Sequence, residues 1–251
     1  MLKIIRRLIP ERFRPIGYLT HLTRVRSGCI VMDGPFAGMR YGPISQGSAY
    51  IPKLLGIYEK ELYPLIGKVV EMAPAMIVDI GAAEGYYAVG LARLLPKARV
   101  IAFEMENSGR EALAHMVGLN HVADTVQIRG KCEPTDLEDV LAKEAEPVVI
   151  CDVEGYEIHL LDLDRVPSLA KASILVELHD FIVPEITQIL RSRFSSTHQI
   201  HHIWQEPRSP KEFPWRTLVT SLLPASYLNW CVSEWRPVKM AWFWMTPLKE
   251  D

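Results

Sequence analysis

The pattern of hydrophobic and polar positions changes character near residue 75. Beyond that point, short apolar runs typical of buried strands alternate with segments whose apolar residues recur at helical spacing. The expected strands cover residues 75–79, 100–104, 126–129, 147–152, 173–178, 198–205 and 238–245, and the expected helices cover residues 86–95, 108–119, 136–143 and 184–194. This alternation predicts an α/β fold: a doubly wound, mostly parallel, seven-stranded Rossmann-like sheet with helices on both faces.

The first 70 residues follow a different pattern, because six prolines between Pro10 and Pro64 prevent any long helix. Their most regular part is the stretch 51–70, where apolar residues recur at helical spacing and predict a helix broken near Pro64. We expect residues 1–70 to form an irregular extension with short helices that cover the ligand cleft. Residues 71–251 should then form the main domain.

The charge of the chain argues against a nucleic-acid-binding protein, since 28 Lys and Arg residues are balanced by 30 Asp and Glu residues. The first 26 residues are an exception, with seven basic residues against the single acid Glu11 and with aliphatic residues interleaved. This segment is either a peripheral membrane or partner contact or a solvated helix. The four cysteines show no disulfide or metal-ligand spacing and no apolar run is long enough to span a bilayer, so we expect a cytoplasmic protein.

A glycine-containing loop, residues 79–85, lies between the first expected strand and the first expected helix of the sheet. Gly81 and Gly85 let the backbone turn sharply and approach a ligand, while the helix that follows offers unpaired N–H groups to an anion. A dinucleotide-binding loop would have a glycine where Ala83 stands, and Glu84 would repel phosphate. The carboxylate and ammonium groups of S-adenosylmethionine suit the loop better, because its acids can reach the ammonium.

Acidic residues end the expected strands, at the edge where sheets of this kind bind their ligands. Glu104 lies 23 residues after Gly81 and can accept hydrogen bonds from both hydroxyls of a ribose, which fits NAD and S-adenosylmethionine equally well. Asp152, Glu154 and Glu157 follow the fourth strand. Three acids at this place are costly unless they bind cations, hydrogen-bond donors or one another.

Three segments of the chain, in their order and spacing, resemble the FkbM-type methyltransferases, which are bacterial enzymes. The segments are IVDIGAAEGYYAVGLA (residues 77–92), VIAFE (100–104) and CDVEGYE (151–157), the last matching the acid-x-Glu-Gly-x-Glu hallmark after the fourth strand. The resemblance implies a seven-stranded S-adenosylmethionine fold and O-methylation of a hydroxyl, often on a sugar or secondary metabolite. It also implies that Asp79, Gly81 and Gly85 serve the methionine end, that Glu104 serves the ribose, and that Asp152 borders the catalytic cleft.

Methyl transfer from a sulfonium requires an aligned acceptor and exclusion of water, and a hydroxyl acceptor must also lose its proton. The candidate catalytic residues are His179, Asp152 and Glu154, and we favour His179 as base because its ordinary pKa lies near neutrality. No metal is assigned, although a divalent ion among these three residues is an alternative. The expected cofactor-binding residues are Asp79, Gly81, Ala82, Glu84, Gly85, Glu104 and Asp152.

The sequence therefore predicts an S-adenosylmethionine-dependent methyltransferase acting on a small molecule or saccharide. The alternatives are an NAD-linked oxidoreductase and a methyltransferase-like binding module without activity. All six tryptophans lie between Trp204 and Trp244, where they could line an acceptor pocket or pack in the core. The sequence leaves the oligomeric state open.

Overall fold

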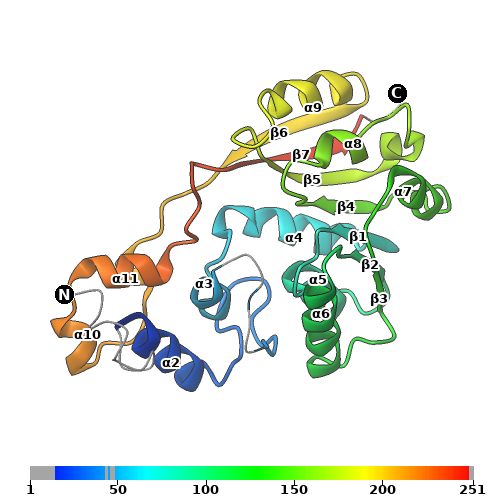
Figure 1. Cartoon of the computed structure of the whole chain (residues 1–251). Helices are drawn as coiled ribbons and strands as arrows, with labels where there is room; N and C mark the ends of the chain where they lie inside the picture. Colours follow the sequence, from blue (N-terminus) through cyan, green and yellow to red (C-terminus); the bar gives the residue numbers. More distant parts are fainter. Residues whose placement is uncertain (1–14, 43–44, 46–48, 249–251) are drawn as a thin grey trace. The chain divides into compact units, whose positions relative to one another are not determined.

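The computed structural model describes residues 15–42, 45 and 49–248, and seven strands of this part form one mixed sheet (Figure 1). The strands are β1 (Met76–Ile80), β2 (Arg99–Phe103), β3 (Val126–Arg129), β4 (Val148–Cys151), β5 (Ser173–Leu178), β6 (His198–Trp204) and β7 (Ala241–Pro247). Their order is β3-β2-β1-β4-β5-β7-β6. β1 to β5 are parallel, and β7 runs antiparallel between β5 and β6. The expected mostly parallel seven-stranded sheet is confirmed.

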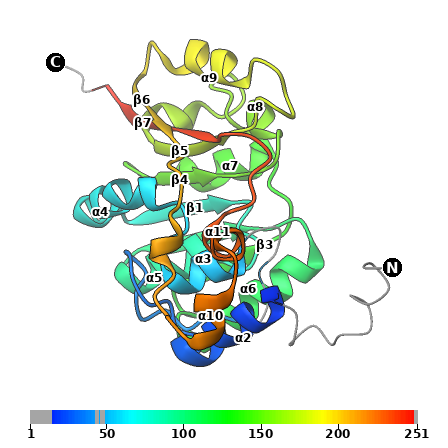
Figure 2. The same cartoon turned by 90° about the vertical axis from the view of Figure 1, so that its left-hand side faces the viewer.

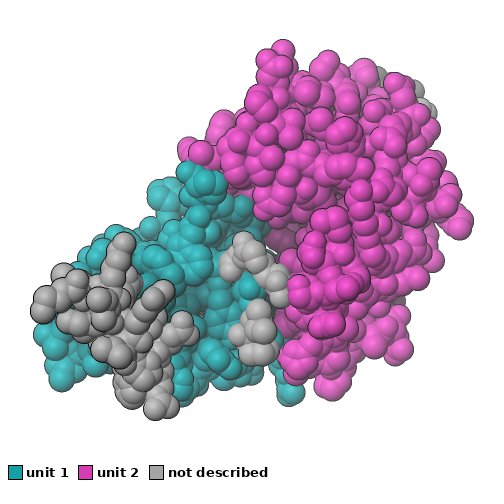
Figure 3. Space-filling model, in the orientation of Figure 1, with its two compact units in different colours: residues 1–60, 206–237 teal, residues 61–205, 238–251 magenta. Residues whose placement is uncertain are grey.

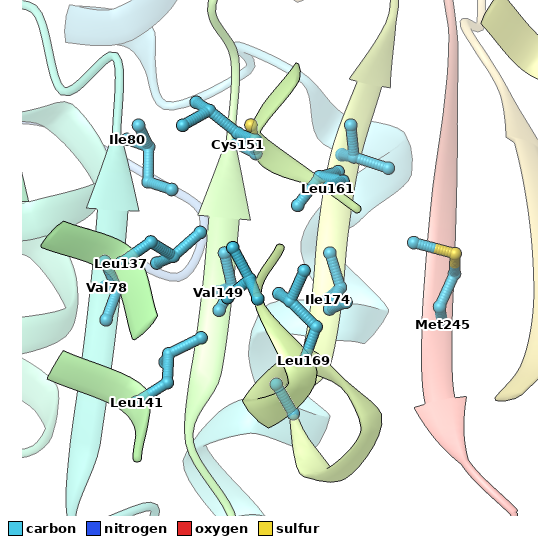
Figure 4. Close-up of a cluster of buried hydrophobic side chains, with 14 of the residues drawn as sticks. Val78, Ile80, Leu137, Leu141, Val149, Cys151, Leu161, Leu169, Ile174 and Met245 are labelled. Atoms are coloured by element: carbon cyan, nitrogen blue, oxygen red, sulfur yellow. The ribbon is translucent and has the colours of Figure 1, made fainter. Parts of the chain in front are cut away.

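Helices cover both faces of the sheet, which explains why the central strands read as continuous apolar runs. Figure 1 shows α4 (Tyr63–Met72), α5 (Tyr86–Leu94) and α6 (Asn107–Leu119) on one face, and α7 (Pro134–Leu141), α8 (Glu157–Leu160) and α9 (Ile186–Phe194) on the other. Figure 4 shows the core beneath α7, where Leu137 and Leu141 pack on Val78 of β1 and Val149 of β4. The sheet is thus a rigid platform for the loops at its carboxyl edge.

The helix expected over residues 51–70 is divided into three pieces. α3 (Tyr50–Leu55) ends at Gly56, whose φ of 72° is left-handed, and a short 3-10 turn, η2 (Lys60–Leu62), leads into α4. Pro64 lies in the first turn of α4, where the missing N–H of proline costs nothing. The helix is broken as predicted, but the break follows Gly56, and Pro64 lies in the first turn of the next α-helix.

The chain forms two compact units, coloured separately in Figure 3. Unit 1 consists of residues 1–60 and 206–237, and unit 2, which contains the sheet, consists of residues 61–205 and 238–251. The boundary expected at residue 70 therefore differs from the observed division, because α4 belongs to unit 2 and residues 206–237 join the N-terminal residues. The covering of a ligand cleft by residues 1–70 stays a prediction.

Unit 1 is held together by its own apolar core and by a buried ionic network. α2 (Pro15–Ser27), α3, and α11 (Ala225–Val232) share the core. In the network, Arg208 pairs with Glu234 at 2.6 Å, and Arg236 pairs with both Glu59 and Glu234. Burial and the nearby Glu59 raise the pKa of Glu234, against the lowering effect of the two arginines. These contacts explain why residues 206–237 join residues far from them in sequence.

Within the described residues, no helix combines the length and the apolar character needed to cross a membrane. The basic segment for which a membrane or partner contact was expected lies largely outside the described residues, since the description begins at Pro15 in α2.

Candidate functional site

The glycine loop after β1 is tied to both neighbouring strands. Gly81 and Ala82 each donate a backbone N–H to the carbonyl of Phe103 at the end of β2, at 2.9 and 3.0 Å. Gly81 has a φ of 82°, and a Cβ atom at this position would lie 1.8 Å from the carbonyl oxygen of Asp152 after β4. Only glycine fits this approach, so the loop sits directly against the strand ends that carry the acids.

The second glycine of the loop packs closely against a neighbouring helix, and its expected approach to a ligand stays a prediction. Gly85 precedes α5, and a Cβ atom there would meet the Leu113 side chain of α6 at 2.2 Å. This glycine therefore permits close packing of α5 and α6. Asp79 and Glu84, the two acids expected to reach a cofactor ammonium, are both buried, and their contact with a cofactor stays a prediction.

Glu104, the expected ribose ligand, is fixed at the tip of β2 beside the glycine loop. Its Oε2 accepts the N–H of Ala83 at 2.8 Å, and its Oε1 accepts the N–H of Glu106 at 2.7 Å. Gly109 of α6 makes room for this side chain, because a Cβ atom there would lie 2.7 Å from the Glu104 Cγ. The structure thus brings together the loop and the acid that the sequence placed 23 residues apart.

The segment after β4 folds into a tight turn that returns an acid to the sheet edge. Glu154 and Gly155 both have positive φ values, 51° and 101°, and α8 begins two residues later. Glu157, the first residue of α8, accepts the N–H of Val153 through Oε1 at 3.1 Å. The turn leaves the Glu154 side chain 74% exposed while Glu157 is completely buried.

His179, which follows β5, lies at the centre of these acids. Its Nδ1 is 2.8 Å from Oε1 of Glu157, and because an ionised carboxylate only accepts, Nδ1–H is the donor. Its Nε2 faces Asp152 and Glu154, each at 3.6 Å, and Glu177 at 3.9 Å. The three expected catalytic residues are therefore brought together, and Glu157 holds the histidine in one tautomer.

The surroundings of His179 make it more basic than an ordinary histidine. Burial by itself would lower the pKa of its imidazole. The hydrogen bond to Glu157 and the negative charges of Asp152, Glu157 and Glu154 outweigh burial, so the pKa lies above its usual value. A proton on Nε2 is stabilised by the carboxylates that face it.

The fold and this geometry can be compared with solved structures. The precorrin-6y C5,15-methyltransferase of Geobacter metallireducens aligns with a TM-score of 0.50 and 10% identity, over 75% of this chain and 89% of that one. The human methyltransferase 10 domain containing protein aligns with a TM-score of 0.51 and 13% identity, over 90% of this chain and 97% of that one. This chain has a Rossmann-like methyltransferase fold. No family model matches the sequence, and neither does any curated protein.

In this methyltransferase fold, the residues that could hold a metal ion differ from the set considered from sequence. Asp152, Glu157 and His179 each offer a ligand atom within 4.8 Å of the others, whereas the sequence alternative named Glu154 in place of Glu157. The Oε2 atom of Glu157 is buried and has no hydrogen-bond partner in the described residues, which is compatible with a cation nearby. The Nδ1–H bond to Glu157 leaves Nε2 as the ring nitrogen that could bind an ion.

The role of Glu157 is the main feature of the site that sequence reasoning missed. The sequence singled out Glu157 as one of three acids after the fourth strand. Its contact with His179 depends on the turn at Glu154 and Gly155, and such a turn produces no periodic pattern in the sequence. The tryptophans were expected to line a pocket or to pack. Trp242 and Trp244 of β7 are buried, which fits packing, while Trp204 is half exposed.

Proposed function

We propose that this chain is an S-adenosylmethionine-dependent methyltransferase that O-methylates a hydroxyl group of a small molecule or saccharide. The methyltransferase fold supports the proposal at the level of the fold. The observation that carries it is the position of Glu104, whose carboxylate accepts the N–H of Ala83 at 2.8 Å. An acid suited to ribose is thereby held against a loop suited to the amino-acid end of the cofactor.

Glu104 and the glycine loop would hold the two ends of the cofactor. Each oxygen of the Glu104 carboxylate accepts one backbone N–H and keeps capacity for a ribose hydroxyl. The N–H groups at the start of α5 suit the methionine carboxylate, and Asp79 and Glu84 are the nearby acids that could contact the ammonium. When bound, S-adenosylmethionine supplies an electrophilic methyl group. Ala83 and Glu84 disfavour the pyrophosphate of NAD, which makes an oxidoreductase the weaker candidate.

His179 would take the proton of the acceptor hydroxyl at Nε2. Glu157 holds the opposite nitrogen as a donor, so Nε2 keeps its lone pair until the proton arrives. The histidine is buried, but the side chain of Asp152 beside it is 43% exposed and that of Glu154 is 74% exposed. These two carboxylates would therefore meet the acceptor first and bind its other hydroxyls.

Membership of the FkbM-type family is part of the same proposal. The family hallmark corresponds to Asp152, Glu154 and Glu157, and in the structure these three acids surround His179. This arrangement gives the hallmark a chemical purpose: the acids stabilise the imidazolium that forms when a hydroxyl loses its proton. The resemblance also supports a saccharide or secondary metabolite as the acceptor.

Isothermal titration tests the cofactor assignment. We expect S-adenosylmethionine and S-adenosylhomocysteine to bind the wild-type protein and NAD to give no heat of binding. Binding of NAD without binding of S-adenosylmethionine would overturn the proposal. An inactive binding module would bind the cofactor but release no S-adenosylhomocysteine with any acceptor in a broad screen of hydroxylated metabolites.

Substitution of the histidine tests the catalytic assignment. His179→Ala should lower turnover by about 10²–10⁴-fold while leaving cofactor affinity near that of the wild type. His201→Ala is a matched control, because His201 is an exposed histidine of β6 in the same unit. Equal turnover in the two variants would remove His179 from the mechanism. Turnover that a chelator abolishes and Mg²⁺ restores would favour the metal-assisted alternative over a histidine base.

A further inference from the structure

Helix α10 (Leu218–Leu222) of unit 1 presents its large apolar side chains to solvent. Leu218 is 79% exposed, Leu222 is 78% exposed, and Val219 between them is 45% exposed. Leu218 and Leu222 are four residues apart and share one side of the helix. A single exposed leucine is ordinary, but three such residues on one short helix form an apolar patch that favours removal from water.

The inner side of α10 is anchored, so the outward position of the leucines is a fixed feature of unit 1. Thr217 caps the helix by accepting the N–H of Thr220 at 3.1 Å, and the buried Thr220 hydroxyl donates to the carbonyl of Trp215 at 3.2 Å. Tyr18 of α2 lies 3.5 Å from the Thr217 hydroxyl. Trp215 and Leu223 pack against the core of unit 1 on either side of the helix. The leucines therefore face away from that core.

The charge of the chain is divided unequally between its two units. Unit 1 contains 14 Lys and Arg residues against 6 Asp and Glu residues, a net charge of +8. Unit 2 contains 14 basic residues against 24 acids, a net charge of −10. The near-neutral total of −2 conceals this asymmetry. Charge asymmetry of this kind points to an anionic partner for the basic unit.

The basic residues of α2 and of the segment that contains α10 have no acidic residue within those segments of the sequence. Residues 15–27 of α2 and residues 213–233, which include α10 and α11, contain no Asp or Glu. Arg24 and Arg26 in the last turn of α2, and Arg216 two residues before α10, are exposed. Figures 1 and 2 both show α2 and α10 next to each other within unit 1. Unit 1 thus carries both the exposed leucines and these exposed arginines, and α2 contacts the start of α10 through Tyr18.

We propose that α10, together with the basic end of α2, docks unit 1 onto an anionic phospholipid bilayer. Leu218 and Leu222 enter the boundary between headgroups and acyl chains, and the three arginines contact lipid phosphates. A nucleic acid would use the arginines but leave the leucines in water. A neutral protein partner would cover the leucines but gain nothing from the charge of +8 on this unit.

Sedimentation of the full chain with vesicles tests the proposal. We expect binding to phosphatidylcholine vesicles that contain phosphatidylglycerol, weaker binding as salt is raised, and little binding to phosphatidylcholine alone. The double variant Leu218→Ser/Leu222→Ser should bind at least about tenfold more weakly, because two apolar side chains no longer leave water. Arg24→Gln/Arg26→Gln should bind about tenfold or more weakly, because each arginine adds about fivefold.

A control variant separates a specific patch from general hydrophobicity. Met72 and Leu94 are exposed apolar residues of unit 2, and Met72→Ser/Leu94→Ser should bind vesicles as the wild type does. All variants should keep the wild-type unfolding temperature and affinity for S-adenosylhomocysteine, which makes this test independent of the proposed function.

Four results would overturn the proposal. If the wild-type protein stays in solution with anionic vesicles, unit 1 has no membrane-docking surface. Equal vesicle binding by the Leu218→Ser/Leu222→Ser variant shows that the leucines do not enter the bilayer. A wild-type dimer that this variant converts to a monomer shows that a second copy covers them, and displacement of the vesicles by double-stranded RNA assigns the basic surface to nucleic acid.

Discussion

Substitution of Gly81 by alanine should destabilise the protein through two effects that the structure allows to be separated. The left-handed backbone at Gly81, with φ of 82°, costs an L-residue about 1–2 kcal/mol. The new Cβ would also lie 1.8 Å from the carbonyl oxygen of Asp152. That carbonyl belongs to the backbone next to β4, where the Asp152 N–H bonds the carbonyl of Ile80 at 2.9 Å, so it cannot turn aside as a side chain can. Overpacking of this kind costs about 1–3 kcal/mol.

The two effects together predict a loss of about 2–5 kcal/mol for Gly81→Ala. Thermal unfolding measures it, because 1 kcal/mol lowers the Tm of a protein of this size by about 2–4 °C, which gives a fall of about 4–20 °C. Gly118→Ala is the matched control, since Gly118 lies in α6 with no atom within 4 Å of a built Cβ. It should gain up to about 1 kcal/mol from helix propensity. A Tm of Gly81→Ala equal to that of the wild type would refute the close approach of the loop to β4.

Two further predictions concern the ligand and the base. Glu104→Gln should weaken S-adenosylhomocysteine binding about tenfold, because an amide cannot accept hydrogen bonds from all the N–H and hydroxyl donors. Titration calorimetry measures this affinity, and Glu106→Gln, at an exposed acid, is the control that should bind as the wild type does. A Glu104→Gln affinity equal to that of the control would refute the role of Glu104 as the ribose ligand. Glu157→Gln removes a hydrogen-bonded charge that raises the pKa of His179, so that pKa should fall. Since the base must be neutral, the rising limb of the turnover profile should then move to lower pH, and a limb that stays in place would argue against His179 as the titrating group.

The sheet was predictable because its strands carry a strong local signal. β1 and β4 are buried on both faces, so β4 is a continuous apolar run and β1 is interrupted only by Asp79, and their expected ends differ from the observed ends by one residue. The helices α8, α10 and α11 were not expected. α8 and α10 have only four and five residues and show no helical period. Short helices are set by caps and tertiary contacts, which a pattern of apolar residues does not reveal.

The two-unit division could not be inferred from sequence for a related reason. The apolar pattern of residues 206–237 does not link them to residues 1–60. Their association with residues 1–60 rests on pairs such as Arg208 with the carbonyl of Ile57, at 2.9 Å and 151 residues apart. Such contacts depend on the three-dimensional path of the chain. A charge count by unit becomes informative only after the path is known.

The site residues were predictable to the extent that topology alone positions them. Asp152 and His179 follow parallel strands that are neighbours in the sheet, so their meeting at one edge follows from the strand order. Glu157 is different, because it reaches His179 only after the left-handed turn at Glu154 and Gly155. Reasoning from strand ends finds the site residues that directly follow strands. It misses residues that reach the site only through a turn.

The cluster of acids around His179 has an electrostatic consequence for catalysis. Four carboxylates lie within 3.9 Å of a ring nitrogen of His179: those of Asp152, Glu154, Glu157 and Glu177. When His179 is neutral, no positive charge on the ring offsets them. A proton delivered to Nε2 places a positive charge among them and relieves their mutual repulsion. In the proposed mechanism, removal of a proton from an acceptor hydroxyl would therefore be favoured by charges that are already in place before the acceptor binds. The acids would not need to touch the reacting oxygen to promote the proposed reaction, because they would act through the basicity of the histidine.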